Sequence, residues 1–167
     1  MNLRKYGTRC FFAVSSMLIV SICDADTQWV LESQESDKYS FTRFIESVQT
    51  FPYTADQSKL TRVRGGFKRL SLGMKKDDVK KIMGEPDAES HNYRPMKESK
   101  KLLYTTWDFY LKRHERNVAT DGFDETVFLY FKPNQELYWA FPSNITGLKP
   151  LGGPHLHPEA SSESALH

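Results

Sequence analysis

The feature that most constrains the fold is a regular alternation of side chains in three short segments. In residues 103–111, 126–132 and 136–141, mostly apolar residues recur at every second position, which is the period of a β-strand with one buried face. The expected core faces carry Leu103, Thr105, Trp107, Phe109 and Leu111, then Val127, Leu129 and Phe131, then Leu137, Trp139 and Phe141. The pattern predicts a small antiparallel sheet, and it accommodates much of the 13% aromatic content.

The second and third segments are expected to form a hairpin. The loop between them, residues 133–135, has three residues. A loop of this length keeps the two apolar faces on the same side of the sheet, pairing Phe131 with Leu137 and Leu129 with Trp139.

The opposite face of this sheet supplies the candidate binding residues: Tyr104, Tyr110, Phe128, Tyr130 and Tyr138. This face is more aromatic than a solvated sheet face requires. Tyrosine is enriched at protein interfaces, because its ring is apolar and its hydroxyl is polar. Two explanations stay open: residues 26–57 or the C-terminal tail cover the rings, or a partner protein or a second copy does.

A short amphipathic helix is expected just before residue 84. Val79, Ile82 and Met83 fall at i, i+3 and i+4 and form one apolar face. Gly84 can take the left-handed conformation that closes a helix, and Pro86 cannot continue one. A phosphate-binding loop would need its glycines before a helix, so Gly84 to Pro86 is interpreted as a helix end.

A weaker helical pattern runs through residues 39–48, and Gly65 and Gly66 are interpreted as a flexible joint. The expected order is therefore one or two helices followed by three strands. This order predicts an α+β domain, with one or two short helices packed on a three-stranded antiparallel sheet.

The first 25 residues have the order of a secretory signal peptide. Arg4, Lys5 and Arg9 precede an apolar stretch at residues 11–22, and small residues lead to a cleavage site after Ala25. The apolar stretch is too short to span a bilayer. We expect a signal peptide at 1–25, an N-terminal extension at 26–64, the α+β domain at 65–146 and a disordered tail at 147–167.

The expected location is the periplasm, with lipidation of Cys23 and anchoring to the outer membrane as the alternative. Cys10 and Cys23 are the two cysteines, so the mature domain would have neither disulfides nor thiolate chemistry. Removing Arg4, Lys5, Arg9 and Asp24 from 23 basic and 21 acidic residues leaves twenty of each. The basic stretch at 59–81 is interpreted as a solvated face, with an anionic-lipid surface as the alternative, and we expect no nucleic-acid binding.

The chain offers little that indicates catalysis. His155 and His157 are spaced like metal ligands but lack nearby carboxylates, and Asp108 and Glu125 are interpreted as solvated strand carboxylates rather than an acid/base pair. We therefore expect no catalytic or metal-ligating residues and no cofactor. The alternative is a small periplasmic hydrolase or a metal-dependent enzyme, which would need a concave site with convergent polar groups.

Three segments resemble one known family. "LGMKKDDVKKIMGEPD" from Leu72, "TTWDFYL" from Thr105 and "VFLYFKPNQELYW" from Val127 are similar to the SmpA/OmlA (BamE-like) family of bacterial envelope proteins. The resemblance covers about residues 70–140. It implies binding without catalysis, a role in outer-membrane assembly or maintenance, and partners among envelope proteins, with homodimer formation and peripheral membrane association as further expectations.

Overall fold

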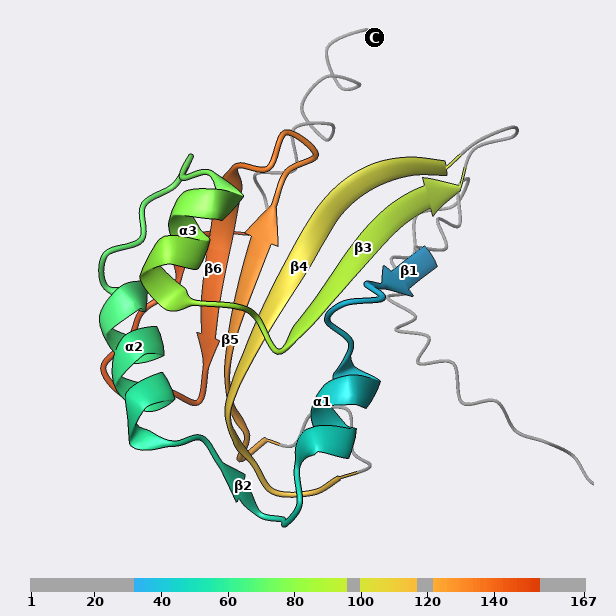
Figure 1. Ribbon diagram of the computed structural model, residues 1–167. Coiled ribbons are helices and arrows are strands. Elements are labelled where there is room, and N and C mark those ends of the chain that lie inside the picture. The colour runs from blue at the N-terminus through green and yellow to red at the C-terminus, as the bar shows by residue number, and fades with distance from the viewer. Residues whose placement is uncertain (1–31, 96–99, 117–121, 154–167) are drawn as a thin grey trace, which may run out of the picture.

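The computed structural model describes residues 32–95, 100–116 and 122–153, so the expected signal peptide at 1–25 lies outside them. The described residues form three helices and seven strands (Figure 1). In chain order these are β1 (Glu32–Glu35), α1 (Phe41–Ser47), β2 (Tyr53–Thr54), α2 (Gln57–Phe67), α3 (Lys76–Met83), β3 (Ala88–Pro95), β4 (Lys100–Arg113), β5 (Glu125–Phe131), β6 (Leu137–Ser143) and β7 (Leu151–Gly152). Within the described ranges no helix is long and apolar enough to cross a membrane.

All seven strands belong to one antiparallel sheet. Its order is β1-β3-β4-β5-β6-β7, and β2 pairs with the last residues of β4. The predicted α+β class is confirmed, but the predicted three-stranded sheet is wrong. The strands β1 and β3 carry the sequences ESQE and AESHNYRP, in which no apolar alternation marks a strand.

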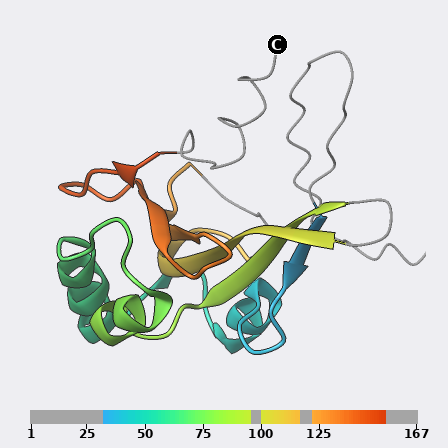
Figure 2. The same ribbon diagram turned by 90° about the horizontal axis from the view of Figure 1, so that it is seen from above.

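The helices α2 and α3 lie together against one face of the sheet (Figure 2), while α1 lies apart from them beside β3 (Figure 1). The helix expected within residues 39–48 is confirmed as α1. It begins where the Ser40 hydroxyl accepts a hydrogen bond of 3.1 Å from the Arg43 amide, a typical N-cap.

The helix expected before residue 84 is confirmed as α3. Its amide at Gly84 donates to the Lys80 carbonyl at 2.8 Å, and Gly84 has a φ of +86°. A side chain at this φ would be strained. The Gly-Glu-Pro segment is thus a helix end, as the sequence predicts.

Gly65 and Gly66 lie inside α2, so their interpretation as a flexible joint is wrong, and the expected boundary between residues 64 and 65 cuts a helix. The Asp56 carboxylate caps α2 by accepting from the Lys59 amide at 2.8 Å. A Cβ at Gly66 would lie 2.9 Å from Met83 Cγ and 3.1 Å from the Ile82 carbonyl oxygen. Gly66 therefore lets α2 approach α3 closely.

The β5–β6 hairpin has the expected three-residue loop. The Lys132 amide donates to the Glu136 carbonyl at 2.9 Å, and Gln135 takes the positive φ of +66° that such loops place at their last residue. Phe131 pairs with Leu137 as predicted.

The predicted pairing of Leu129 with Trp139 is wrong. The register shifts between Phe131 and Tyr130. As a result Tyr130 lies opposite Trp139, and Leu129 lies opposite Ala140. The extra residue, Tyr138, is a β-bulge, which moves every later side chain of β6 to the other face. Trp139 and Phe141 therefore lie on the opposite face of the sheet, and Ala140 lies on the core face.

The main core lies between this face and the helices α2 and α3. Trp107, Phe109 and Leu129 pack there with Val79, and Ile82 packs at its border. Trp107 is 4% exposed, and its ring meets Phe131 edge-on at 4.9 Å between centroids. The helix-to-sheet contact predicted for Val79 and Trp107 is confirmed.

Replacing Trp107 with Ala should lower the free energy of unfolding by about 3–5 kcal/mol, because it leaves a large cavity in the core. Chemical denaturation measures this loss. Phe123→Ala is the control: Phe123 is 71% exposed, so its loss should stay within about 0.5 kcal/mol. A similarly small loss for Trp107→Ala would contradict the burial described above.

The two neighbouring glycines of α2 should respond oppositely to alanine. No atom lies within 4 Å of a Cβ at Gly65, so Gly65→Ala should stabilise the helix by about 0.5–1 kcal/mol. Gly66→Ala should destabilise the protein by about 1–3 kcal/mol, because α3 must shift. Thermal and chemical denaturation of both variants test this pair, and equal effects would contradict the close approach of α2 and α3.

Candidate functional site

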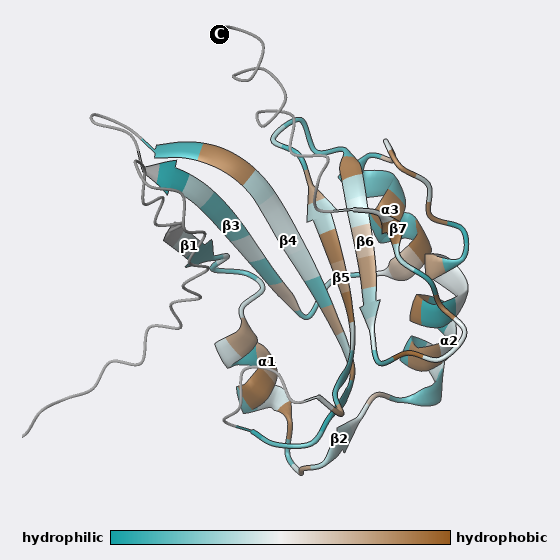
Figure 3. Cartoon of the chain, turned by 180° about the vertical axis from the view of Figure 1, so that it is seen from behind, coloured by the Kyte–Doolittle hydropathy of each residue, from teal (hydrophilic) through white to brown (hydrophobic). Residues whose placement is uncertain are grey.

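Figure 3 views the sheet from behind, where no described helix lies over β4, β5 and β6. This face of the three strands carries a group of aromatic rings. We call this group the aromatic strip, and it consists of Tyr104, Phe128, Tyr130, Tyr138, Trp139 and Phe141. Four of these residues were expected on this face. Trp139 and Phe141 were assigned to the core, and they join the strip because of the bulge at Tyr138.

Tyr130 lies at the centre of the strip. Its ring stacks on Trp139 with 4.2 Å between centroids and 18° between planes. It also contacts Tyr104 at 5.9 Å and Tyr138 at 6.2 Å. These separations are within the range of favourable aromatic pairs, so the rings hold one another in place.

The strip is most open at its Phe141 end. Phe141 is 37% exposed and stacks on the half-buried Phe128 at 6.4 Å. Burial raises the pKa of the hydroxyl groups of Tyr104, Tyr130 and Tyr138. All three tyrosines are therefore neutral near pH 7, and the strip presents rings and hydroxyls without charge.

Tyr110, the fifth expected binding residue, does not belong to the strip. It is 5% exposed and lies in a second hydrophobic cluster with Phe44, Val48 and Ala88. Its ring lies 4.6 Å from Phe44 and 5.7 Å from Phe41 of α1. The helix α1 thus covers Tyr110, which is one of the two explanations that the sequence left open.

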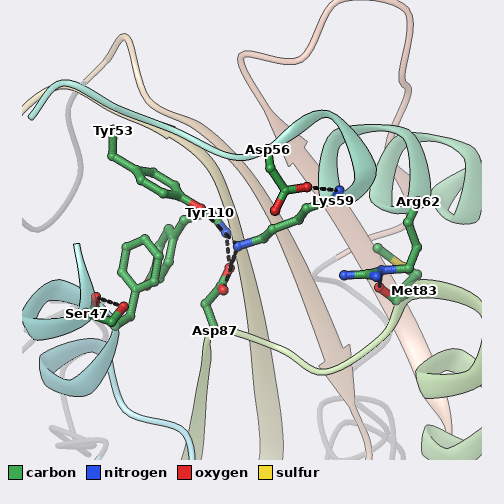
Figure 4. A network of polar contacts seen from close by, with 9 residues as sticks. Ser47, Tyr53, Asp56, Lys59, Arg62, Met83, Asp87 and Tyr110 are labelled. Atoms are coloured by element: carbon green, nitrogen blue, oxygen red, sulfur yellow. Dashed lines mark hydrogen bonds and ion pairs between the residues drawn. The ribbon is translucent and has the colours of Figure 1, made fainter. Parts of the chain in front are cut away.

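A network of polar contacts joins this second cluster to α2 (Figure 4). Lys59 Nζ donates to both carboxylate oxygens of Asp87, at 2.6 and 2.7 Å, and to the Tyr53 hydroxyl at 3.3 Å. Asp87 Oδ2 also accepts from the Tyr110 amide at 2.7 Å. The residues of this network satisfy one another, so it is best explained as a structural link.

Asp108 lies where the region covered by α1 meets the aromatic strip. Its Oδ2 accepts from the Tyr110 hydroxyl at 3.0 Å, whereas Oδ1 is buried and has no hydrogen-bond partner. Burial raises the pKa of Asp108 to about 7, and the Tyr110 hydrogen bond opposes this increase. Asp87 and Glu35 raise the pKa further, and Arg113 lowers it. The expectation of a solvated carboxylate is therefore wrong for Asp108.

Asp108 and Glu125, the pair considered for acid/base chemistry, are not brought together. Asp108 alternates with Trp107 and lies on the face of the strip, opposite Phe128. Glu125 lies on the other face, where Arg64 of α2 binds it at 2.5 Å.

The histidines do not form a metal site within the described ranges. His91 lies 3.1 Å from the Thr105 hydroxyl and 3.7 Å from the carboxylate of Glu89. No group of three His, Cys, Asp or Glu side chains that could hold a metal occurs among residues 32–95, 100–116 and 122–153. His155 and His157 lie outside these ranges, as does most of the expected tail.

A wide, open depression lies at the start of β5. It is lined by Gly122, Phe123, Glu125, Pro142, Asn144, Ile145 and Thr146. Glu125 is its one acidic side chain and is engaged by Arg64. The lining therefore brings no set of polar groups to a common point.

Comparison of the chain with family models, curated proteins and solved structures found no match. The resemblance to the SmpA/OmlA family therefore stays a prediction. The three segments that carry it correspond to α3, the middle of β4 and the β5–β6 hairpin.

Asp108→Asn should change the pH dependence of stability. The folded protein holds a proton on Asp108 up to about pH 7, whereas the unfolded chain releases it near pH 4. The stability of the wild type must therefore fall as pH rises through this window. Asn cannot ionise beside Asp87, Glu35, Tyr110 and Arg113. Between pH 5 and pH 8 the variant should therefore gain about 2.5 kcal/mol relative to the wild type.

Chemical denaturation at several pH values measures this gain. Asp77→Asn is the control, because Asp77 is exposed on α3. Parallel pH profiles for Asp108→Asn and the wild type would contradict the raised pKa.

Proposed function

We propose that this chain is a non-enzymatic protein-binding module of the bacterial cell envelope and that the aromatic strip is its binding surface. The observation that supports this most is the continuity of the strip. Six rings form a continuous series of contacts on a region of the sheet face that no described helix covers, and Phe141 at one end is 37% exposed.

The chemistry of the strip suits a protein partner. Tyr and Trp are over-represented at interface hot spots, because each buries a large apolar surface and keeps one polar atom for a hydrogen bond. The rings of the strip also pack against one another before any partner binds, which restricts their movement. A preformed surface loses less side-chain entropy when a partner binds.

The cellular setting of this proposal rests on the sequence. The order of the first 25 residues favours export to the periplasm, or lipidation at Cys23. The resemblance of α3, β4 and the β5–β6 hairpin to the SmpA/OmlA family favours a role in outer-membrane assembly or maintenance. The partner is accordingly an envelope protein.

The alternative of a small hydrolase or metal-dependent enzyme has less support in the described residues. Asp108 and Glu125 lie on opposite faces of the sheet. Asp108 does have the raised pKa that catalytic acids often show. Among the described residues its hydrogen-bond partner is the Tyr110 hydroxyl, whose pKa is raised by burial, so Tyr110 stays protonated and is a poor base or nucleophile.

The double variant Trp139→Thr, Phe141→Thr tests the proposed surface. Both residues are at least partly exposed, and threonine retains the preference for a strand. Chemical cross-linking in intact bacterial envelopes measures the amount of protein joined to its partner. This amount should fall by at least about tenfold, which corresponds to a loss of about 1.4 kcal/mol or more in binding free energy. The thermal transition should change by only a few degrees.

Phe123→Thr is the matched control, because Phe123 is 71% exposed but lies outside the strip. It should keep every cross-link. If the double variant folds and keeps its cross-links, the strip is not the binding surface. If the captured partner is the chain itself, the strip is a homodimer interface.

A further inference from the structure

A carboxylate next to the aromatic strip lacks a matching cation. Asp108 Oδ1 has no hydrogen-bond partner, and Asp108 takes part in no ion pair within the described ranges. Asp108 as a residue is half-buried, although its Oδ1 atom is not exposed. An unpaired carboxylate in such a place is costly unless something binds it.

The neighbouring cations are held by other carboxylates. Lys59 binds Asp87 at 2.6 Å, and Arg113 lies 3.5 Å from Asp124. Glu35 is exposed at the end of β1, and its charge adds to that of Asp108. When Asp108 is ionised, the excess charge at this point of the face is therefore negative.

Aromatic rings lie on the open side of Asp108. Phe128 is directly across from it on β5, and Tyr130 is the diagonal neighbour. On the other side, Ala88 is directly across on β3, and α1 covers Ala88 and Tyr110. A ligand that binds Asp108 would therefore approach from the strip and contact Phe128 and Tyr130.

We propose that the protein partner of the aromatic strip inserts an arginine side chain, whose guanidinium group binds Asp108 and stacks against Phe128 and Tyr130. This proposal rests on the proposed function and specifies its partner. Carboxylate and ring faces together favour a cation. Arginine fits better than lysine, because its guanidinium is flat, stacks on rings and donates several hydrogen bonds in one plane.

The experiment titrates the purified chain with N-acetyl-arginine amide and, separately, with N-acetyl-citrulline amide. Citrulline has nearly the shape of arginine but no charge. Two-dimensional NMR follows the backbone amides of Phe128, Tyr130 and Tyr110. The arginine probe should shift these signals saturably in the millimolar range, and the citrulline probe should bind at least tenfold more weakly.

Two variants locate the binding site. Asp108→Asn should abolish the shifts caused by the arginine probe, and it is expected to remain folded. Asp77→Asn removes the same charge from α3 and should bind the probe like the wild type. Equal binding of the two probes, no saturable shift with the wild type, or unchanged binding by Asp108→Asn would each overturn the proposal.

These outcomes are separable from the test of the proposed function. The cross-linking experiment depends on Trp139 and Phe141, whereas the NMR experiment depends on Asp108. If cross-links are lost in the double variant while Asp108→Asn has no effect on the probe, the strip binds a partner without using an arginine at Asp108. If the double variant keeps its cross-links, the proposed function itself fails.

Discussion

One extra residue in β6 decides which side chains reach the uncovered face of the sheet. Because strand side chains alternate with a period of two, the bulge at Tyr138 places Trp139 and Phe141 beside Tyr130 and Phe128. It places Ala140, which is fully buried, over the main core instead. Without the bulge, two large rings would compete for the space against α2 and α3, and the strip would lose its stack on Tyr130.

The rest of the fold is organised around two hydrophobic clusters on opposite faces of β4. The main cluster lies under α2 and α3, and the smaller one lies under α1. The ion pair between Lys59 and Asp87 joins them, because Lys59 extends from α2 and Asp87 also holds the backbone of Tyr110. Both side chains are well shielded from water, so this pair is less screened by salt than a surface pair.

The sequence predicts those elements in which local signals agree. In α3 the apolar face, the acidic first turn and the terminal glycine all indicate the same helix. In β4 and β5 the alternation alone identifies the core face. The helix α2 has a cap at Asp56 and apolar residues at Leu60, Val63 and Phe67, but the adjacent Gly65 and Gly66 indicate a break in the sequence pattern. The role of Gly66 depends on its contact with α3, and no local sequence pattern indicates that contact.

The remaining differences have a similar origin. The strands β1 and β3 are polar and are defined by pairing with residues far along the chain. The bulge has no signal in the spacing of β6. The environment of Asp108 depends on the docking of α1 and on cross-strand neighbours, so a strand carboxylate that looks solvated in the sequence becomes buried.

The edges of the sheet give the fold one more property. Among the described residues its outermost strands are β1, with four residues, and β7, with two. At the start of β6 the backbone groups of Leu137 are already paired: its amide donates to the Met74 carbonyl and its carbonyl accepts from the Gly73 amide, both at 2.8 Å. Short edge strands with exposed charged residues such as Glu35 hinder the edge-to-edge pairing by which open sheets aggregate. The described part of the chain therefore displays a large aromatic face on a sheet whose edge strands are short.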